Sequence, residues 1–492
     1  MTQSIAMFRT EHDLIGELAV PIDAYYGIHA LRAVENFQIS GTTIGASSDL
    51  IMALAAIKEA AAEANAELGL LDEQRKLAIV TACREIREGA LHDQFVIDPI
   101  QGGAGTSTNM NANEVIANRA LEILGHAKGD YACLHPNEHV NCGQSTNDVY
   151  PTALKLASLT SIGRLLVAMN VLRLSFAAKA EEFADVLKMG RTQLQDAVPM
   201  TLGQEFGTYA LMLAEDEARL REASALIQEI NLGGTAIGTG ITSHPQYAAL
   251  IRERLSTIVD VKLITAPDLI EATQDCGAFV QLSGVLKRIA VKLSKVCNDL
   301  RLLSSGPRAG FNEINLPPRQ AGSSIMPGKV NPVIPEVVNQ IAFEVIGNDV
   351  TITMAAEGGQ LQLNAFEPII FYSLERSISH LTAGCLTLEK HCVRGITANR
   401  ELLRAQVERS IGIVTALNPF IGYQHATDVA VEAHKTGQGV YEIVLARGLM
   451  TREHLDRVLS PELLTRPFDS LALLATPNSE NQFLSVPAAG TA

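Results

Sequence analysis

The stretch GSSIMPGKVNP at residues 322–332 combines chemically active side chains with a constrained backbone. Its two glycines and two prolines predict a loop. Within that loop Ser323 and Ser324 offer hydroxyl groups, Lys329 offers an ammonium group, and Asn331 offers a carboxamide. Such a set can bind an anion, and a serine among these donors could act as a nucleophile or a base. The stretch therefore fits a loop that closes over an anionic ligand, although most stretches of this composition are ordinary surface loops.

Three further segments are rich in hydroxyl and carboxamide groups. Their candidate ligand residues are Thr106 in segment 102–111, Ser145, Thr146 and Asn147 in segment 144–148, and Thr192 and Gln193 in segment 190–196. Each segment taken alone is more typical of a helix cap than of a ligand site. Together with the Lys329 loop, they predict a site for a small dianion. Hydroxyls, amides and one lysine would hold its carboxylates, and helix N-termini would add partial positive charge.

Other chemistries fit the sequence poorly. There is no GxxxxGK[ST] phosphate loop, no GxGxxG motif after a strand, and no HExxH motif. Segment 233–240 has the glycines of a dinucleotide loop but not their spacing, and we interpret it as a loop between helices. His135 and His139 are separated by Pro136, which argues against a shared helical face and a metal site. We therefore expect neither a metal ion nor a cofactor.

Composition and charge narrow the class of protein. Of the 492 residues, 47% are hydrophobic, only 5% are aromatic and none is Trp, which favours helix-on-helix packing over a β-sandwich. The formal net charge of -15 disfavours nucleic acid as a partner, since phosphate binding requires a basic surface. Seven cysteines without a CxxC pair indicate reduced thiols. Because no signal-peptide pattern or membrane-spanning apolar run is visible, we expect a soluble cytoplasmic protein with no membrane partner.

Apolar residues at steps of three and four predict long helices. These run over 282–303, from soon after Pro151 through Phe176, over 205–230, from near Pro335, and over 374–392. A shorter helix is predicted over 50–68, with Asp49 as its N-cap and Gly69 as its C-cap. Helices this long usually bury their apolar faces in a bundle, often between subunits. We divide the chain into a mixed, mostly helical region 1–145, a central long-helix region 146–401, and a small helical region 402–492 with a disordered tail from Thr476.

Further motifs allow a family resemblance to be stated. The segments AYYGIH at 24–29, RAVENF at 32–37 and LLSSGPRAG at 302–310 look like motifs of the aspartase/fumarase superfamily, as does the 322–332 loop. The chain resembles this superfamily over nearly its whole length. The segment VIPEVVNQ at 333–340 is similar to the aspartase branch and not to the fumarases.

The resemblance implies a mainly all-α, three-domain fold whose central long helices form the core of a homotetramer. It also implies active sites shared by three subunits. The implied reaction is the reversible anti-elimination of ammonia from L-aspartate to give fumarate, with no cofactor. A base removes a proton next to the β-carboxylate, and the site must stabilise the dianionic aci-carboxylate that results.

By matching position, the resemblance also implies roles for individual residues. Ser323 would be the general base, and Lys329 would be catalytic and would hold the α-carboxylate with Thr192 and Asn331. The remaining matches are Ser324, Thr106, Ser145 and Thr146 on the β-carboxylate, Asn147 on the amino group, and Glu336 in support. His135, Asn137 and Glu138 match a second anion site of fumarases.

Gln193 departs from the superfamily pattern, since many members carry a histidine at this position. A glutamine can donate a hydrogen bond to a carboxylate but does not titrate near neutral pH. This argues against fumarate hydratase, which is the alternative enzyme. A catalytically silent structural homologue is the other alternative, and the intact set of site residues argues against it.

Overall fold

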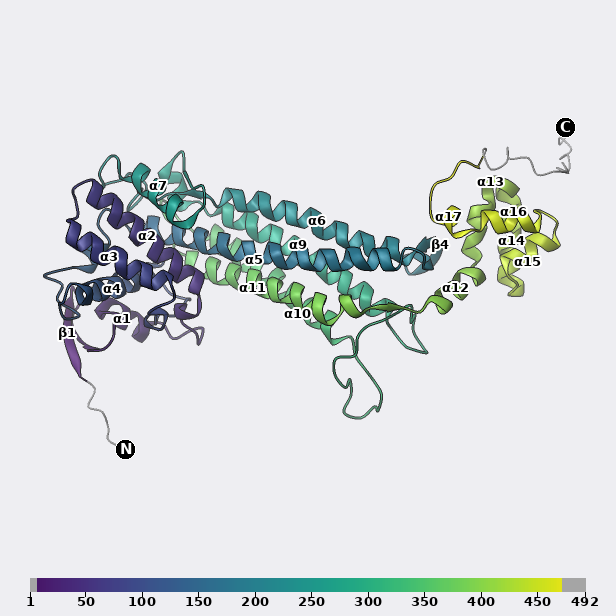
Figure 1. Ribbon diagram of the computed structural model, residues 1–492, viewed down its shortest axis with the longest axis horizontal. Helices are drawn as coiled ribbons and strands as arrows, with labels where there is room; N and C mark the ends of the chain where they lie inside the picture. The colour runs from purple at the N-terminus through teal and green to yellow at the C-terminus, as the bar shows by residue number, and fades with distance from the viewer. Residues whose placement is uncertain (1–6, 471–492) are drawn as a thin grey trace. The chain divides into compact units, whose positions relative to one another are not determined.

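The computed structural model describes residues 7–470, and these are mainly helical, as predicted (Figure 1). The chain divides into two compact units. Unit 1 comprises the residues up to Leu174, Leu211–Arg301 and Pro318–Cys392. Unit 2 comprises Ser175–Ala210, Leu302–Pro317 and the residues from Val393. These units do not test the division into regions 1–145, 146–401 and 402–492, which stays a prediction.

Unit 1 begins with a hairpin and several short helices. The elements are β1 (Phe8–Asp13), β2 (Gly16–Pro21), α1 (Ile28–Asn36), α2 (Ser48–Glu67), α3 (Glu73–Arg87), α4 (Thr106–Ile123), a π-helix (Pro136–Val140), α7 (Tyr247–Val259) and α8 (Leu269–Gln274). Helix α2 packs against α3 and α7. The alanine-rich face of α2 is buried, because small side chains let the neighbouring helices approach closely.

The five predicted long helices are present (Figure 1). They are α5 (Thr146–Glu182), α6 (Leu202–Leu226), α9 (Gly277–Leu303), α10 (Val333–Glu357) and α11 (Glu367–His391). In α9 the predicted apolar positions, such as Leu286, Ile289 and Leu293, are buried. Helix α10 packs along α11. Periodic apolar spacing therefore predicted both the existence of these helices and their buried faces.

Two predicted helix boundaries were wrong. Helix α5 begins at Thr146, before Pro151, because the Ser145 hydroxyl and the Asp148 carboxylate cap its first turn. Helix α6 ends at Leu226 and does not reach residue 230. The chain there extends instead into β5 (Glu229–Ile230), which pairs in parallel with β6 (Ile264–Thr265).

The predicted cap at the start of α2 was also wrong. Asp49 lies inside the first turn, and its carboxylate forms an ion pair with Arg164 of α5. An aspartate at this position still favours the helix, because a negative charge near an N-terminus offsets the helix dipole. Gly69 follows the helix with φ +73, which fits the predicted glycine at its end.

Unit 2 contains two small sheets and short helices. The strands are β3 (Leu187–Thr192), β4 (Gln195–Thr201), β7 (Ile314–Asn315) and β8 (Thr397–Ala398). The helices are α12 (Arg400–Arg409), α13 (Asn418–Ile421), α14 (Tyr423–Thr436), α15 (Val440–Ala446), α16 (Arg452–Val458) and α17 (Pro461–Leu464). Met189, Leu417, Val429 and Val444 lie in its buried core. The predicted disordered tail from Thr476 lies outside the described residues.

By length and mean hydropathy alone, α5 is long and apolar enough to cross a membrane. Its Asp148 and Lys155 are buried, and the Lys155 ammonium donates a hydrogen bond of 2.7 Å to the Glu229 carbonyl. Burial lowers the pKa of Lys155, which Glu367 partly opposes. Such internal polar partners are typical of the core helix of a helical bundle.

Candidate active site

The N-termini of α4 and α5 meet in unit 1. Thr106 is the first residue of α4, and Gly105 before it has φ +85. A Cβ atom on Gly105 would collide with the ring of Tyr150 in α5, so only glycine permits this close approach. Asn109 Nδ2 donates a hydrogen bond of 3.2 Å to Thr146 Oγ1. Two helix N-termini, each carrying a threonine hydroxyl, therefore adjoin and favour an anion.

The segment Ser145–Asn147 is held in a fixed conformation at this junction. The Asn147 N–H donates to Ser145 Oγ at 3.2 Å, and the Ser145 N–H donates to Asp148 Oδ1 at 3.0 Å. The three side chains of the segment are half-buried, so they combine order with access. The structure thus brings four predicted substrate-binding residues together, with Thr106 as the fourth.

Lys58 of α2 supports this junction from within, and the sequence analysis missed it. Its side chain is fully buried, and its ammonium donates to Asn141 Oδ1 at 2.8 Å and Gln144 Oε1 at 2.9 Å. Burial lowers its pKa to about 7, although the charge of Asp148 opposes this shift. The sequence signal was a single lysine on the apolar, alanine-rich face of a helix. Lys58 therefore supports the segment that leads into Ser145 through these two hydrogen bonds.

The loop at residues 322–332 is closed on itself. The Gly322 N–H donates to the Lys329 carbonyl, and Asn331 Nδ2 donates to the Gly322 carbonyl, each at 2.8 Å. A Cβ atom on Gly322 would lie 2.8 Å from the Lys329 carbonyl oxygen, so a side chain there would open the loop. The glycine-rich pattern therefore reflects a real steric requirement.

Two backbone donors of this loop point at the predicted base. Ser323 Oγ accepts hydrogen bonds from the N–H groups of Ile325 at 3.1 Å and Met326 at 2.9 Å. Donors placed around an oxygen stabilise negative charge on it, so they favour the alkoxide form of the serine. Ser324 and Lys329 are exposed, Asn331 is half-buried, and Glu336 lies in the first turn of α10.

Within a single chain, the loop at residues 322–332 is not in contact with the cluster formed by Thr106 and Ser145–Asn147. Figure 1 places the loop before α10 at one end of the helical layer of unit 1 and α4 at the other. Among residues 7–470, no hydrogen bond or ion pair links the Ser323 loop to Thr106, Ser145, Thr146 or Asn147. The predicted site residues therefore form separate groups in the single chain.

Thr192 and Gln193 form the third group, at the tip of the β3–β4 hairpin in unit 2. Thr192 pairs with Gln195, and the turn residues Gln193 and Leu194 have φ values of 55 and 63. Such two-residue turns normally contain Asn-Gly, because non-glycine residues are strained in this left-handed region. All three side chains from Thr192 to Leu194 are exposed. A strained, exposed turn that carries two predicted ligand residues is typical of a functional site.

A buried carboxylate anchors that hairpin. Glu313 is fully buried and accepts from Arg191 at 2.5 Å, while Lys188 lies 2.8 Å from its other carboxylate oxygen. The Arg191 guanidinium also lies over the Phe311 ring, 4.4 Å from its centroid. Two cations of one strand therefore share a single fixed anion directly before the strained turn, which holds the turn in place.

The two histidines at 135 and 139 are engaged locally. His135 Nδ1 accepts from the N–H groups of Asn137 at 3.0 Å and Glu138 at 3.3 Å. His139 Nδ1 accepts from the His135 N–H at 2.8 Å. Within residues 7–470 no group of three His, Cys, Asp or Glu side chains is placed to hold a metal ion.

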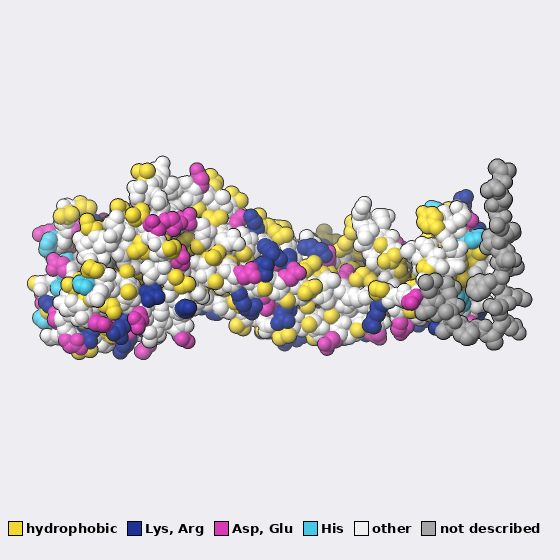
Figure 2. Space-filling model, turned by 90° about the horizontal axis from the view of Figure 1, so that it is seen from above, with side chains coloured by type: hydrophobic (Ala, Val, Ile, Leu, Met, Phe, Trp, Pro, Cys, Tyr) yellow, Lys and Arg dark blue, Asp and Glu magenta, His cyan; other side chains and the backbone are white. Residues whose placement is uncertain are grey.

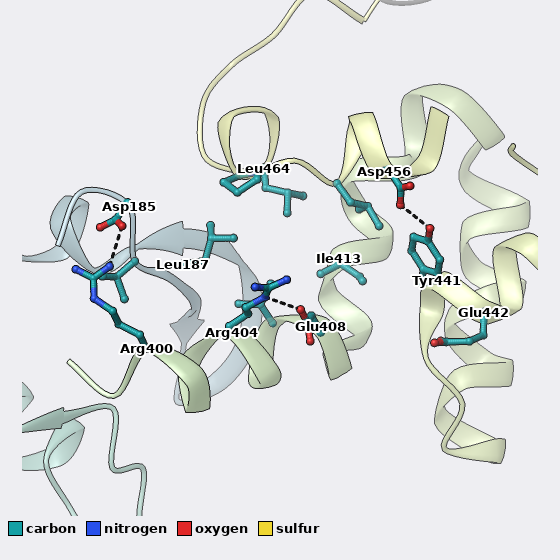
Figure 3. Close-up of a pocket in the computed structure, with 14 residues that line it drawn as sticks. Asp185, Leu187, Arg400, Arg404, Glu408, Ile413, Tyr441, Glu442, Asp456 and Leu464 are labelled. Atoms are coloured by element: carbon teal, nitrogen blue, oxygen red, sulfur yellow. Dashed lines mark hydrogen bonds and ion pairs between the residues drawn. The ribbon is translucent and has the colours of Figure 1, made fainter. Parts of the chain in front are cut away.

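Unit 2 also contains a cavity of about 680 Å³ that is separate from these groups (Figure 3). In Figure 3, Arg400 points toward Asp185 at 2.8 Å, and the Tyr441 hydroxyl points toward Asp456 at 2.5 Å. Arg404 pairs with Glu408 at 2.8 Å, so most of the polar side chains that line the cavity are paired with one another. None of the predicted site residues lines this cavity.

Comparisons with known proteins cover almost the whole chain. Residues 16–347 match the sequence model of a family described as lyase, and residues 413–466 match that described as fumarase C C-terminus. An aspartate ammonia-lyase from Pseudomonas canavaninivorans is 60% identical over 465 residues, which are 94% of this chain and 98% of that protein. An aspartate ammonia-lyase from Escherichia coli is 54% identical over 460 residues, which are 93% and 96% of the two chains.

Solved structures share the fold. A fumarate lyase:delta crystallin from Brucella melitensis, crystallised bound to cobalt, has a TM-score of 0.92 and 55% identity, covering 94% of this chain and all of its own. A class II fumarase from Schistosoma mansoni has a TM-score of 0.88 and 36% identity, covering 92% of this chain and 98% of its own. The arrangement of helices described above therefore recurs in both proteins.

Proposed function

Because the chain belongs to the aspartase/fumarase superfamily, we propose that it catalyses the reversible anti-elimination of ammonia from L-aspartate to give fumarate. The observation that carries this proposal is similarity to aspartate ammonia-lyases at 54–60% identity over nearly the full length of both proteins. The site supports it independently, since hydroxyl and amide donors at two helix N-termini suit a dicarboxylate. Fumarate hydratase is not favoured, because Gln193 offers no titrating group.

In this mechanism, Ser323 removes a proton from the carbon next to the β-carboxylate. The N–H groups of Ile325 and Met326 stabilise the serine alkoxide that acts as the base. The β-carboxylate then carries the charge of the aci-carboxylate intermediate. Donors around this group accelerate the reaction because they bind the intermediate more strongly than the substrate.

We assign the remaining groups to substrate binding. The β-carboxylate is held by Thr106, Ser145, Thr146 and Ser324, and the α-carboxylate by Thr192, Lys329 and Asn331. Asn147 contacts the amino group, Gln193 borders the site, and Glu336 supports the loop. Ammonia leaves already protonated as ammonium, so no histidine acid is required at position 193.

We propose that the active enzyme is a homotetramer whose sites are each shared by three subunits. Apolar side chains of α10 support this, since Phe343, Val350 and Met354 are 62%, 56% and 69% exposed and follow one helical face. In Figure 2, apolar side chains lie at the surface of the long helices between charged ones. Neighbouring subunits would cover the apolar face of α10 and bring together the separate groups of site residues.

A tetramer predicts a specific result in solution. Size-exclusion chromatography with light scattering should give about four times the chain mass of 52.8 kDa. Phe343→Asp, which places a charge in the proposed interface, should lower both the mass and the activity. Phe8→Asp, at another exposed apolar position outside the long helices, is the control. A monodisperse monomer with full activity would exclude shared sites.

Substrate choice is tested by measuring fumarate absorbance with L-aspartate and with L-malate side by side. Aspartate should react at least about a hundredfold faster, because one missing or mismatched polar contact in a polar site costs a large factor. The variant Gln193→His measures how much the glutamine contributes to the preference for aspartate over malate. This preference should be smaller in the variant than in the natural enzyme. Faster turnover of malate by the natural enzyme would contradict the proposal.

We further propose that the enzyme uses no cofactor or metal ion and works in the cytoplasm. All seven cysteines are free, which suits a reducing compartment. The proposed partners are the dicarboxylate, ammonia and further copies of this chain. The net charge of -15 supports the exclusion of nucleic acid.

A further inference from the structure

The carbonyl group of Asn147 has an unusual partner. Pro151 lies four residues later inside α5 and has no N–H to donate to this carbonyl, as an ordinary helical residue would. The Asn231 side chain takes that role, and its Nδ2 donates to the Asn147 oxygen at 2.9 Å. The substrate-binding segment is thereby joined to the glycine-rich loop at residues 231–240.

The Asp148 side chain binds the same loop through backbone N–H groups of the loop. Its Oδ2 accepts hydrogen bonds from the N–H groups of Gly233 and Thr235, each at 3.0 Å, while its Oδ1 holds the Ser145 N–H. The carboxylate is fully buried. Burial raises its pKa to about 6, although these hydrogen bonds, the largest from Ser145, favour the ionised form. Thr235 has φ +54, so the loop is held in a strained conformation that the carboxylate helps to fix.

The loop decides which end of the Asn147 amide faces the site. Asn147 Nδ2 donates to the Ala236 carbonyl at 2.7 Å. A backbone carbonyl can only accept, so the amide must turn its NH₂ group toward the loop. The Oδ1 atom accepts no hydrogen bond from the residues at 7–470 and is left as a free acceptor. The neighbouring predicted ligands, Thr106, Ser145 and Thr146, are hydroxyl groups that can donate.

We infer that Asp148 and Asn231 are positioning residues that, through the loop at 231–236, present Asn147 Oδ1 as the acceptor for the substrate's amino group. This inference rests on the proposed function and adds a structural basis for amine recognition. An acceptor among donors suits a ligand with carboxylates and one ammonium group, because the ammonium can only donate. A dicarboxylate without an amino group, such as succinate, has no use for this acceptor.

The decisive comparison is between aspartate, which has the amino group, and succinate, which lacks it. Asn231→Ala removes the donor to the Asn147 carbonyl and leaves Asp148 and all predicted ligands in place. The substitution also removes the hydrogen bond of 3.0 Å from Asn231 Nδ2 to Thr273 Oγ1, so the melting temperature of the variant is measured beside its kinetics. The KM for aspartate should rise about tenfold or more, while the inhibition constant of succinate should change less than about threefold.

Asn118→Ala is the matched control. Asn118 is equally buried, and its Nδ2 also donates to a main-chain carbonyl, that of Tyr25, at 2.8 Å. It contacts none of the predicted site residues, so both constants should stay within about twofold of the natural enzyme. If Asn231→Ala weakens the binding of aspartate and of succinate equally, or the binding of neither, the orienting role of the loop is excluded.

Asp148→Ala tests the other anchor, with Glu114→Ala as its control. Glu114 is a buried carboxylate that accepts the N–H groups of Gly27, His29 and Ala30 at the start of α1, away from the site. Asp148→Ala should weaken the binding of both ligands, because the Ser145 N–H also loses its acceptor. The affinity for aspartate should fall about tenfold more than the affinity for succinate. Equal factors would exclude Asp148 as a positioning residue for Asn147. If Asp148→Ala does not assemble, Asn231→Ala decides the inference alone.

The natural enzyme separates failure of this inference from failure of the proposed function. Absence of aspartate turnover in the natural enzyme would overturn both. Normal turnover, combined with equal effects of Asn231→Ala on aspartate and succinate, would overturn only the inference.

Discussion

Lys329→Ala is expected to weaken aspartate binding and to slow turnover together. The Lys329 ammonium is exposed and forms no hydrogen bond or ion pair with the residues at 7–470, so it is free to bind a ligand. In the closed site it would be the main cation on the α-carboxylate. Losing a charge-assisted hydrogen bond to a buried partner costs about 2–5 kcal/mol, so kcat/KM should fall by roughly thirtyfold or more.

Steady-state kinetics with aspartate, and inhibition by succinate, measure this effect. Lys76→Ala is a suitable control, because Lys76 pairs with Glu73 on the surface of α3, outside the proposed site. An unchanged affinity in Lys329→Ala would mean that another cation holds the carboxylate. Arg32 is a poor replacement, since its guanidinium already binds Asp13 through two hydrogen bonds of 2.7 and 2.9 Å.

Local patterns in the sequence predicted the long helices and the donor-rich segments. Apolar spacing located α9 and α11 because each buries one continuous stripe, and this stripe is a property of the segment itself. Glycines marked the loop at 322–332 because Gly322 has no space for a side chain. Wherever a single segment carries the physical constraint, its sequence is sufficient to predict the structure.

Contacts between distant segments could not be predicted in this way. Asp49 looks like a helix cap, but its partner is Arg164, which is far away in the sequence. Lys58 lies in an alanine-rich helix, and only the fold shows that it supports Asn141 and Gln144. The loop at 231–240 looked like a simple connection, because its ties to Asn147 and Asp148 depend on tertiary structure.

The complete site could not be predicted from local patterns either, because its assembly would depend on quaternary structure. A single chain places the Ser323 loop and the Thr106 cluster at different ends of unit 1, and neither position violates a local rule. The family resemblance predicted sites shared between subunits, and the separation of these groups gives that prediction a physical reason. Exposed apolar positions on α10 supply the surface through which such an assembly can form.

Ser323→Ala should have the largest effect of any single substitution in the proposed site. It removes the proton acceptor and leaves the carboxylate donors in place, so turnover should fall by about 10²–10⁴-fold, as for other positioned bases. The affinity for succinate should change little, because binding depends on Thr106, Ser145, Thr192, Lys329 and Asn331. The tetramer and the melting temperature should persist, since this hydroxyl contacts only the backbone of its own loop.

Ser324→Ala is the matched control for this assignment. Ser324 is the adjacent hydroxyl and is exposed, and the backbone N–H groups of Ile325 and Met326 point at Ser323 instead. Loss of its one proposed hydrogen bond to the β-carboxylate should cost about 1.5–3 kcal/mol, which is roughly a ten- to 150-fold loss of kcat/KM. The base is wrongly assigned if Ser324→Ala is the more damaging substitution, or if Ser323→Ala keeps a substantial fraction of the activity. Since both variants share one loop and one fold, the ratio of their rates isolates the chemistry of the Ser323 oxygen.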